Sequence, residues 1–326
     1  MRKYFTYKRM LIYSILLLLL FELYTYNIRG EKPNPYEAPV AKENITPTST
    51  PEPKINSIDD PKVLLVRNTI LQLDDSTDEV IRKLGLPGRI AETEYDFTYY
   101  IYNNDYKNLL FVALQDNKVV GFYTDALDFE YHGFQYGASL DEINTALEED
   151  FKLTKVLTTN ISEYKVSILM DNLETGKAVG IYVLSNAVKE DGYNEEIMTQ
   201  VEQMVYDLTN SIRVRHGLEP LSWSSSASQA AKKHSMHMAT KNFFSHVDPS
   251  FRSPGDRLNA EGVSYKNSGE NIIAGYGSAI LSSHGWYVSE SHRRNLLNKN
   301  FRYLGVGFAY DEDSIYKTYI TQNFYR

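Results

Sequence analysis

A short apolar run follows a cluster of basic residues at the start of the chain. Residues 11–21 are almost wholly apolar, and four cations precede them: Arg2, Lys3, Lys8 and Arg9. A cationic start before such a run is typical of an export signal. The run is shorter than the ~20 residues that span a bilayer, but an extension through Tyr26 gives a marginal span. No small-residue cleavage site follows, so we predict an uncleaved signal anchor over residues 1–28.

The flanking charges predict the orientation of this anchor. Cytoplasmic flanks of membrane helices carry an excess of Lys and Arg. The basic cluster is therefore expected in the cytoplasm and the later residues outside it. This makes the chain a single-pass protein of the cell membrane with extracytoplasmic globular domains. Secretion after signal cleavage is the alternative.

Residues 29–60 have the composition of a tether. Seven of the eleven prolines fall within residues 33–61, among Thr, Ser, Glu and Lys and with few aliphatic side chains. Such a segment cannot bury a core and stays extended and solvated. We predict a Pro-rich linker between the anchor and the globular part of the chain.

Residues 61–191 show one pattern twice, which predicts a small α+β domain with two repeats of ~60 residues. Ser76 and Ser139, 63 residues apart, each precede acidic residues and an apolar face at helical spacing, as expected of a capped helix. Apolar runs typical of strands follow each helix. They occupy residues 99–102, 109–114 and 119–123 in the first copy and residues 164–170 and 178–183 in the second.

Residues 192–326 begin with two helical patterns. The first runs from about residue 192 to Arg215, and Gly217 suits the left-handed residue that follows a helix. The second spans residues 225–241, where alanines, His234 and Met238 recur at helical spacing. The fold class expected for the whole chain is α+β.

Composition excludes several classes of protein. The hydrophobic content of 42% supports real cores, and the absence of cysteine excludes disulfide scaffolds, thiolate metal sites and a Cys nucleophile. The formal net charge of −8 argues against a nucleic-acid partner. Residues 61–194 hold 12 Lys and Arg against 22 Asp and Glu. We interpret this acidic region as a solubilising surface; a partner-docking or cation-attracting face is the alternative. Within it, Asp125, Asp128 and Glu130 are interpreted as a solvated face.

The residues that could act as ligands or in catalysis gather near the C-terminus, where six of the seven histidines follow residue 215. Several short motifs surround them. They are His234-Ser235-x-x-Met238-Ala239, Phe243-Phe244-Ser245-His246, Ser253-Pro254-x-x-Arg257, Gly269-Glu270-Asn271-Ile272, Trp286-x-x-Ser289-x-x-His292-Arg293-x-Asn295-Leu296-Leu297 and Gly305-Val306-Gly307-Phe308.

In this order the motifs resemble the CAP superfamily of cysteine-rich secretory, antigen 5 and pathogenesis-related proteins. Residues 61–191 resemble the CAP-associated domain that precedes this module in some bacterial exported proteins. The resemblance implies an α-β-α sandwich over residues 192–326, with a cleft that holds two His and two acidic residues. His246, Glu270 and His292 match three of these positions. The fourth falls on Ser289, where the eukaryotic pattern has Glu.

The chemistry of these residue types leaves several roles open. His246 and His292 could supply nitrogen ligands to zinc or a similar divalent ion. Glu270 could complete that site, orient an imidazole or act as a general base. Ser291 is expected to cap the helix that carries His292. A buried polar network that merely holds the sandwich together is the alternative to a ligand or metal site.

The other motif residues are interpreted as structural. We expect Asn271 to hydrogen-bond backbone groups, Arg293 to pair with a carboxylate and Trp286 to lie in the core. His234 and His237 could chelate a metal on one helix face, but a structural role is preferred. His284 is expected to be partly exposed.

The sequence favours binding over catalysis. We expect the cleft to bind a lipid, an envelope glycan or peptide, or a protein. The alternative is a hydrolase of envelope material, either metal-dependent or built from Ser289 or Ser245 with His246, His292 and Glu270. No nucleophile elbow of the Gly-x-Ser-x-Gly type supports it. A third reading is structural, with the acidic repeats docked on the C-terminal domain and covering or regulating its cleft.

Overall fold

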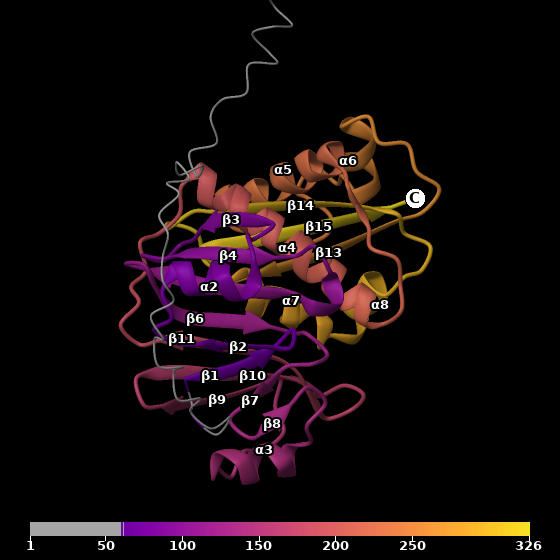
Figure 1. Ribbon diagram of the computed structural model, residues 1–326. Coiled ribbons are helices and arrows are strands. Elements are labelled where there is room, and N and C mark those ends of the chain that lie inside the picture. The colour runs from indigo at the N-terminus through magenta and orange to yellow at the C-terminus, as the bar shows by residue number, and fades with distance from the viewer. Residues whose placement is uncertain (1–59, 61) are drawn as a thin grey trace, which may run out of the picture. The chain divides into compact units, whose positions relative to one another are not determined.

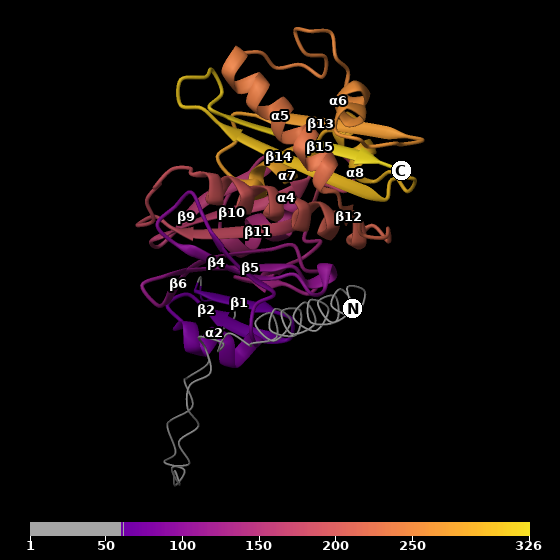
Figure 2. The same cartoon turned by 90° about the horizontal axis from the view of Figure 1, so that it is seen from above.

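A computed structural model describes residues 60 and 62–326 (Figures 1 and 2). The anchor predicted over residues 1–28 and nearly all of the linker lie outside these residues. Within the described part, no helix is long and apolar enough to cross a bilayer.

Two sheets and two short helices make up residues 63–185. The small sheet has the order β2-β1-β7-β8, with β1 (Val63–Val66), β2 (Thr69–Gln72), β7 (Glu130–Tyr131) and β8 (Phe134–Gln135). The large antiparallel sheet has the order β3-β4-β5-β6-β11-β10-β9. Its strands are β3 (Arg89–Glu92), β4 (Thr98–Tyr102), β5 (Leu110–Gln115), β6 (Lys118–Thr124), β9 (Val156–Ile161), β10 (Tyr164–Asp171) and β11 (Lys177–Ser185). A 3₁₀ turn, η1 (Tyr106–Asn108), precedes β5.

Helices α2 (Thr77–Leu84) and α3 (Leu140–Leu147) occur where the sequence predicts them. Each starts with a capping box, in which the serine N-cap exchanges hydrogen bonds with a glutamate three residues later. The pairs are Ser76 with Glu79 and Ser139 with Glu142. The large sheet unites the strands of both halves, because β6 pairs directly with β11. The duplication itself stays a prediction.

The large sheet is buried on both faces. One face shares a core with α2, α3 and the small sheet, through side chains such as Phe122 and Ile181. The other face shares a core with the C-terminal residues, through side chains such as Tyr99 and Phe111. Strands β10 and β11 accordingly read as nearly continuous apolar runs, as expected of strands covered on both sides.

The C-terminal residues form three layers (Figure 2). The central sheet has the order β12-β14-β15-β13, with β12 (Ser222–Trp223), β13 (Ser268–Ala274), β14 (Tyr303–Tyr310) and β15 (Thr318–Tyr325). Helices α5 (Ser225–Lys241) and α6 (Pro254–Ala260) cover one face; α4 (Glu195–Arg215), α7 (Ala279–Tyr287) and α8 (Glu290–Leu296) cover the other. Trp286 is fully buried, as predicted.

Two glycines on β14 allow α5 to approach the sheet closely. A Cβ at Gly305 would collide with the backbone of Ser228, and a Cβ at Gly307 with the backbone of Lys232. The Ser228 hydroxyl donates to the Val306 carbonyl and the Ser235 hydroxyl to the Gly307 carbonyl. This contact explains why glycine recurs in the Gly-Val-Gly-Phe motif.

Buried ion pairs join the two halves of the described chain. Arg89 Nη2 lies 2.6 Å from Asp207 Oδ2, and Arg293 Nη1 lies 2.7 Å from Asp171 Oδ1. Asp125 lies 3.0 Å from Arg215 Nη2, and the Ser211 hydroxyl contacts both of its oxygens at 2.8 Å. The sequence interpretation of Asp125 as part of a solvated face is therefore wrong, because Arg215 and Ser211 offset the cost of burying its charge.

Candidate functional site

A loop and a strand position the first two candidate residues. His246 lies in the loop that follows α5, and Glu270 lies on β13. His246 Nδ1 is 2.8 Å from Glu270 Oε1. The His246 side chain is half exposed, whereas that of Glu270 is only 2% exposed. Glu270 therefore holds the imidazole from the protein side and leaves its other edge toward solvent.

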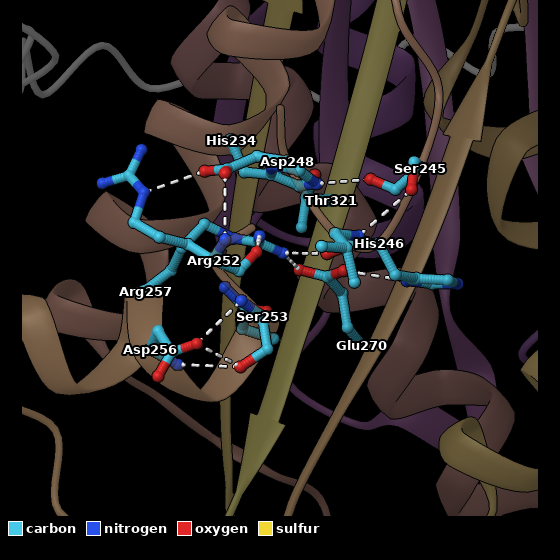
Figure 3. A network of polar contacts seen from close by, with 12 residues as sticks. His234, Ser245, His246, Asp248, Arg252, Ser253, Asp256, Arg257, Glu270 and Thr321 are labelled. Atoms are coloured by element: carbon cyan, nitrogen blue, oxygen red, sulfur yellow. Dashed lines mark hydrogen bonds and ion pairs between the residues drawn. The ribbon is translucent and has the colours of Figure 1, made fainter. Parts of the chain in front are cut away.

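Arg257 completes the support of Glu270 (Figure 3). Its Nη2 donates to Glu270 Oε2 at 2.6 Å and to the His246 carbonyl at 3.0 Å. Its Nη1 donates to the Arg252 carbonyl at 3.0 Å. One buried guanidinium thus ties the His246 loop to the carboxylate. Arg257 belongs to one of the sequence motifs, but the sequence alone suggested no role for it, because the groups that it contacts lie on separate segments of the chain.

Ser289 and His292 form the second pair. Ser289 is the N-cap of α8, but its side chain makes no capping hydrogen bond. Its hydroxyl instead lies 2.9 Å from His292 Nδ1. The prediction of Ser291 as the cap is wrong, because the helix begins at Glu290.

Amide side chains bring the two pairs together. Asn271 Nδ2 donates to the His292 carbonyl at 3.3 Å, as expected for a backbone-binding amide. Asn295 Nδ2 donates to the Glu270 carbonyl at 3.1 Å and to Asn271 Oδ1 at 2.9 Å. Burial lowers the pKa of His292, and the charge of His246 lowers it further. The two imidazoles therefore lie near enough to interact.

Both halves of the chain are similar to known protein families. The sequence model of the cysteine-rich secretory protein family, CAP, matches residues 206–324, and that of the CAP-associated N-terminal domain matches residues 73–174. The uncharacterized membrane protein YlbC of Bacillus subtilis is 31% identical over 292 residues, which cover 76% of this chain and 80% of that protein. The chain belongs to the CAP family.

Other proteins are similar to part of this CAP protein or to its fold. The uncharacterized protein YkwD of Bacillus subtilis is 41% identical over 108 residues, 33% of this chain and 42% of that protein. An extracellular SCP-domain protein from Bacillus anthracis superposes with a TM-score of 0.65 at 23% identity, covering 88% of this chain and 99% of that one. A cysteine-rich secretory protein from Staphylococcus aureus superposes with a TM-score of 0.60 at 15% identity. The superposition covers 78% of this chain and 93% of that one. At these identities the structures show the fold alone.

We call His246, Glu270, Ser289 and His292 the CAP site. In both imidazoles Nδ1 faces a partner within the chain, and neither Nε2 has a hydrogen-bond partner among the described residues. Both Nε2 atoms are thus the nitrogens that remain for an external group.

The CAP site does not fit a resident zinc ion. Zinc enzymes supply three protein ligands and structural sites four. Glu270 is occupied by His246 and Arg257, so two imidazole nitrogens remain. No group of three or more His, Cys, Asp or Glu residues with metal-binding geometry occurs in the described part of the chain.

The site also lacks a continuous catalytic triad. In such a triad an acid orients the histidine that activates the serine. Here Ser289 contacts His292, whereas Glu270 contacts His246. The serine and the carboxylate therefore serve different imidazoles.

Three other histidines of this domain have structural surroundings. His234 is buried, its Nε2 lies 3.0 Å from the Ser245 carbonyl, and burial lowers its pKa to about 4. His237 Nδ1 is 3.8 Å from Asp248. His284 is also buried, with Nε2 2.8 Å from the Lys155 carbonyl, so the prediction of partial exposure is wrong. Burial lowers its pKa to about 4 as well.

Exposed apolar side chains accompany His246 on its loop. Phe244 is 45% exposed, Val247 47% and Phe251 89%. Phe251 also holds a left-handed backbone conformation with φ of 61°, which is rare for a bulky residue. The loop thus presents apolar surface beside a half-exposed imidazole.

Proposed function

We propose that this CAP protein binds an amphipathic ligand of the cell envelope at the CAP site, on the outer side of a membrane that holds residues 1–28. The observation that carries the proposal is the combination of two imidazoles with unpartnered Nε2 atoms and exposed apolar side chains on the loop of His246.

The polar half of the ligand would meet His246 and His292. Their Nδ1 partners fix the orientation of both rings, so binding would order few additional groups. Glu270 and Arg257 form a buried ion pair beneath the loop, which supports His246 in place. A phosphate, carboxylate or hydroxyl group would suit the two Nε2 positions, since imidazoles donate or accept there.

The apolar half would meet Phe244, Val247 and Phe251. Exposed apolar patches on soluble domains mark sites for partners, ligands or membranes. The relative YlbC is named a membrane protein, which supports the anchor. A ligand from the same envelope would be within reach of a tethered domain.

A hydrolase remains the second candidate, supported by the contact of 2.9 Å between Ser289 Oγ and His292 Nδ1. Glu270 contacts His246 and not this Ser289–His292 pair, and this favours binding over hydrolysis. Release of acyl or peptide products from a probe would establish turnover.

The test uses the full chain in amphipol, without detergent, and dihexanoylphosphatidylglycerol below its micelle concentration. A ligand that binds the folded state at 100 times its Kd stabilises it by about 2.7 kcal/mol. We expect saturable stabilisation of the wild type and none of the His246→Ala/His292→Ala variant. His132→Asn, in the CAP-associated domain, is the matched control, because asparagine tolerates the left-handed φ of 45° at that position.

The headgroup alone, glycerophosphoglycerol, should stabilise the wild type less than the lipid does. Equal stabilisation of the wild type and the double variant, or no stabilisation of either, would overturn the proposal. Chromatography of the probe after incubation separates binding, which leaves it intact, from hydrolysis.

A further inference from the structure

A pocket lies between the CAP-associated and CAP halves of the chain, and none of the four CAP-site residues lines it. Its volume is about 240 Å³. Two carboxylates, four tyrosines and a lysine contribute to its lining, with glycines and a threonine between them: Glu94, Glu190, Tyr193, Tyr276, Tyr310, Tyr316 and Lys317. Pockets for drug-sized ligands measure roughly 300–1,000 Å³. This pocket is therefore suited to one small group.

Glu94 is the unusual member of this lining. It is 95% buried, and no hydrogen bond or ion pair joins its carboxylate to another described side chain. Its backbone is held firmly, since the Glu94 carbonyl accepts the N–H groups of Asp191 at 2.7 Å and Gly192 at 3.1 Å. An ionised carboxylate removed from water without a counter-ion is costly. Burial raises the pKa of Glu94 to about 7; a hydrogen bond with its own backbone opposes this shift, and the charge of Glu190 adds to it.

Glu190 brings a second negative charge to the same pocket. It lies opposite Tyr95, the neighbour of Glu94, in an antiparallel bridge. Lys317 contributes a positive charge to the lining but makes no ion pair with either carboxylate in the described residues. With both carboxylates ionised, the three charges sum to −1. One monovalent cation would neutralise the pocket.

The tyrosines supply the second feature that favours a cation. The ring centroid of Tyr193 lies 4.8 Å from that of Tyr310 with an interplanar angle of 33°. The Tyr193 hydroxyl donates to the Gly277 carbonyl at 3.3 Å, which fixes the ring. Tyr316 is 46% exposed at the lining. Aromatic rings attract ammonium groups through their quadrupole, and cages of such rings recognise alkylated ammonium ions.

We propose that this pocket binds an organic ammonium group, with Glu94 and Glu190 as its counter-ions and the tyrosines around it. The ammonium could belong to a primary amine, as on a lysine side chain, or to a quaternary headgroup. Both present the same charge to the carboxylates and differ in their contact with the rings. None of the four CAP-site residues lines this pocket, although the rings of Tyr316 and Phe244 are in contact, so each proposal is tested with its own variants.

The test is calorimetric titration of the full chain in amphipol with n-butylammonium chloride and with choline chloride, at constant ionic strength. The neutral molecules 1-butanol and 3,3-dimethyl-1-butanol have the same numbers of non-hydrogen atoms as n-butylammonium and choline and serve as controls for the charge. We expect saturable binding of at least one cation and at least tenfold weaker binding of its neutral counterpart. Preference for choline would indicate a quaternary headgroup, and preference for n-butylammonium a primary amine.

Glu94→Gln removes the charge and keeps the shape of the side chain. We expect it to raise the Kd at least tenfold, whereas Glu92→Gln, an exposed neighbour outside the pocket, should leave the Kd unchanged. Wild-type affinity should rise between about pH 6 and 8 as Glu94 ionises, and this dependence should vanish in Glu94→Gln. The other titratable groups around Glu94 are Glu190, Tyr95, Tyr99, Tyr182, Tyr193, Tyr276, Tyr310, Tyr316 and Lys317.

Three results would overturn the proposal. The first is the absence of saturable binding by either cation. The second is equal affinity for a cation and its neutral counterpart. The third is an unchanged Kd in Glu94→Gln.

Discussion

The ion pair between Asp171 and Arg293 connects the CAP-associated domain to the helix that carries His292. Asp171 is the last residue of β10, and Arg293 directly follows His292 on α8. Their side chains are 2% and 6% exposed, and the contact is 2.7 Å long. Asp171→Asn removes the negative charge with little change of shape. We expect it to destabilise the protein and to loosen α8.

The surroundings of Arg293 set the magnitude. Removal of one partner from a buried ion pair costs about 3–5 kcal/mol. Arg293 would keep Glu174 at 3.0 Å, the Tyr287 hydroxyl at 2.9 Å and the Tyr287 ring at 4.2 Å. Because these contacts remain, we expect the loss in free energy of unfolding to lie near the lower limit of this range, at about 3 kcal/mol. At roughly 2–4 °C per kcal/mol, Tm should fall by about 6–12 °C.

Calorimetry of the full chain measures this change, and Glu174→Gln is its matched control. The Glu174 side chain is 65% exposed, so its ion pair should contribute less than about 1 kcal/mol. A fall in Tm below 2 °C in Asp171→Asn, or equal falls in both variants, would refute the reasoning.

The pH dependence provides a second check on Asp171. Burial alone would raise its pKa, but hydrogen bonding and attraction from Arg293 outweigh burial and lower the pKa below its usual value. A carboxyl with a lowered folded-state pKa stabilises the protein above its unfolded pKa of about 3.9. The difference between wild type and Asp171→Asn should therefore be constant above about pH 5. It should shrink as the pH falls below about 4.

Three further predictions concern the C-terminal domain. Gly307→Ala should lower the free energy of unfolding, measured by urea denaturation, by about 1–3 kcal/mol or more, because its Cβ would meet the backbone of α5. Gly277 has open space around it, so Gly277→Ala should lower that free energy by less than about 1 kcal/mol. Equal losses of stability would contradict the packing argument. His246→Ala should raise the pKa of His292, since it removes a repelling charge; an unchanged NMR titration of His292 would show that the rings do not interact. Elemental mass spectrometry should find less than one zinc ion per chain, and near-stoichiometric zinc lost in His246→Ala/His292→Ala would refute our reading of the donor set.

Short-range chemistry made much of the fold predictable. Ser76 and Ser139 cap their helices as expected, because a capping box depends only on residues three positions apart. Helix α5 spans Ser225–Lys241, as the spacing of its apolar residues predicted. The order of the motifs likewise predicted the CAP family, which the comparisons confirm. The three misassigned residues, Asp125, His284 and Ser291, depended on contacts or helix limits that local pattern does not specify.

The sequence by itself determined the capped helices, five strands of the CAP-associated domain and the family, and it supplied the candidate residues of the CAP site. Tertiary structure decided which of those residues touch. Glu270 could have served a metal, a general base or an imidazole, and only the fold directs its two oxygens to His246 and Arg257. The fold also brought Glu94 into one pocket with tyrosines that follow it by about 100 to more than 200 positions in the chain. The physical reason is that hydrogen bonds and charges act over a few ångströms in space, whereas the sequence records only distance along the chain.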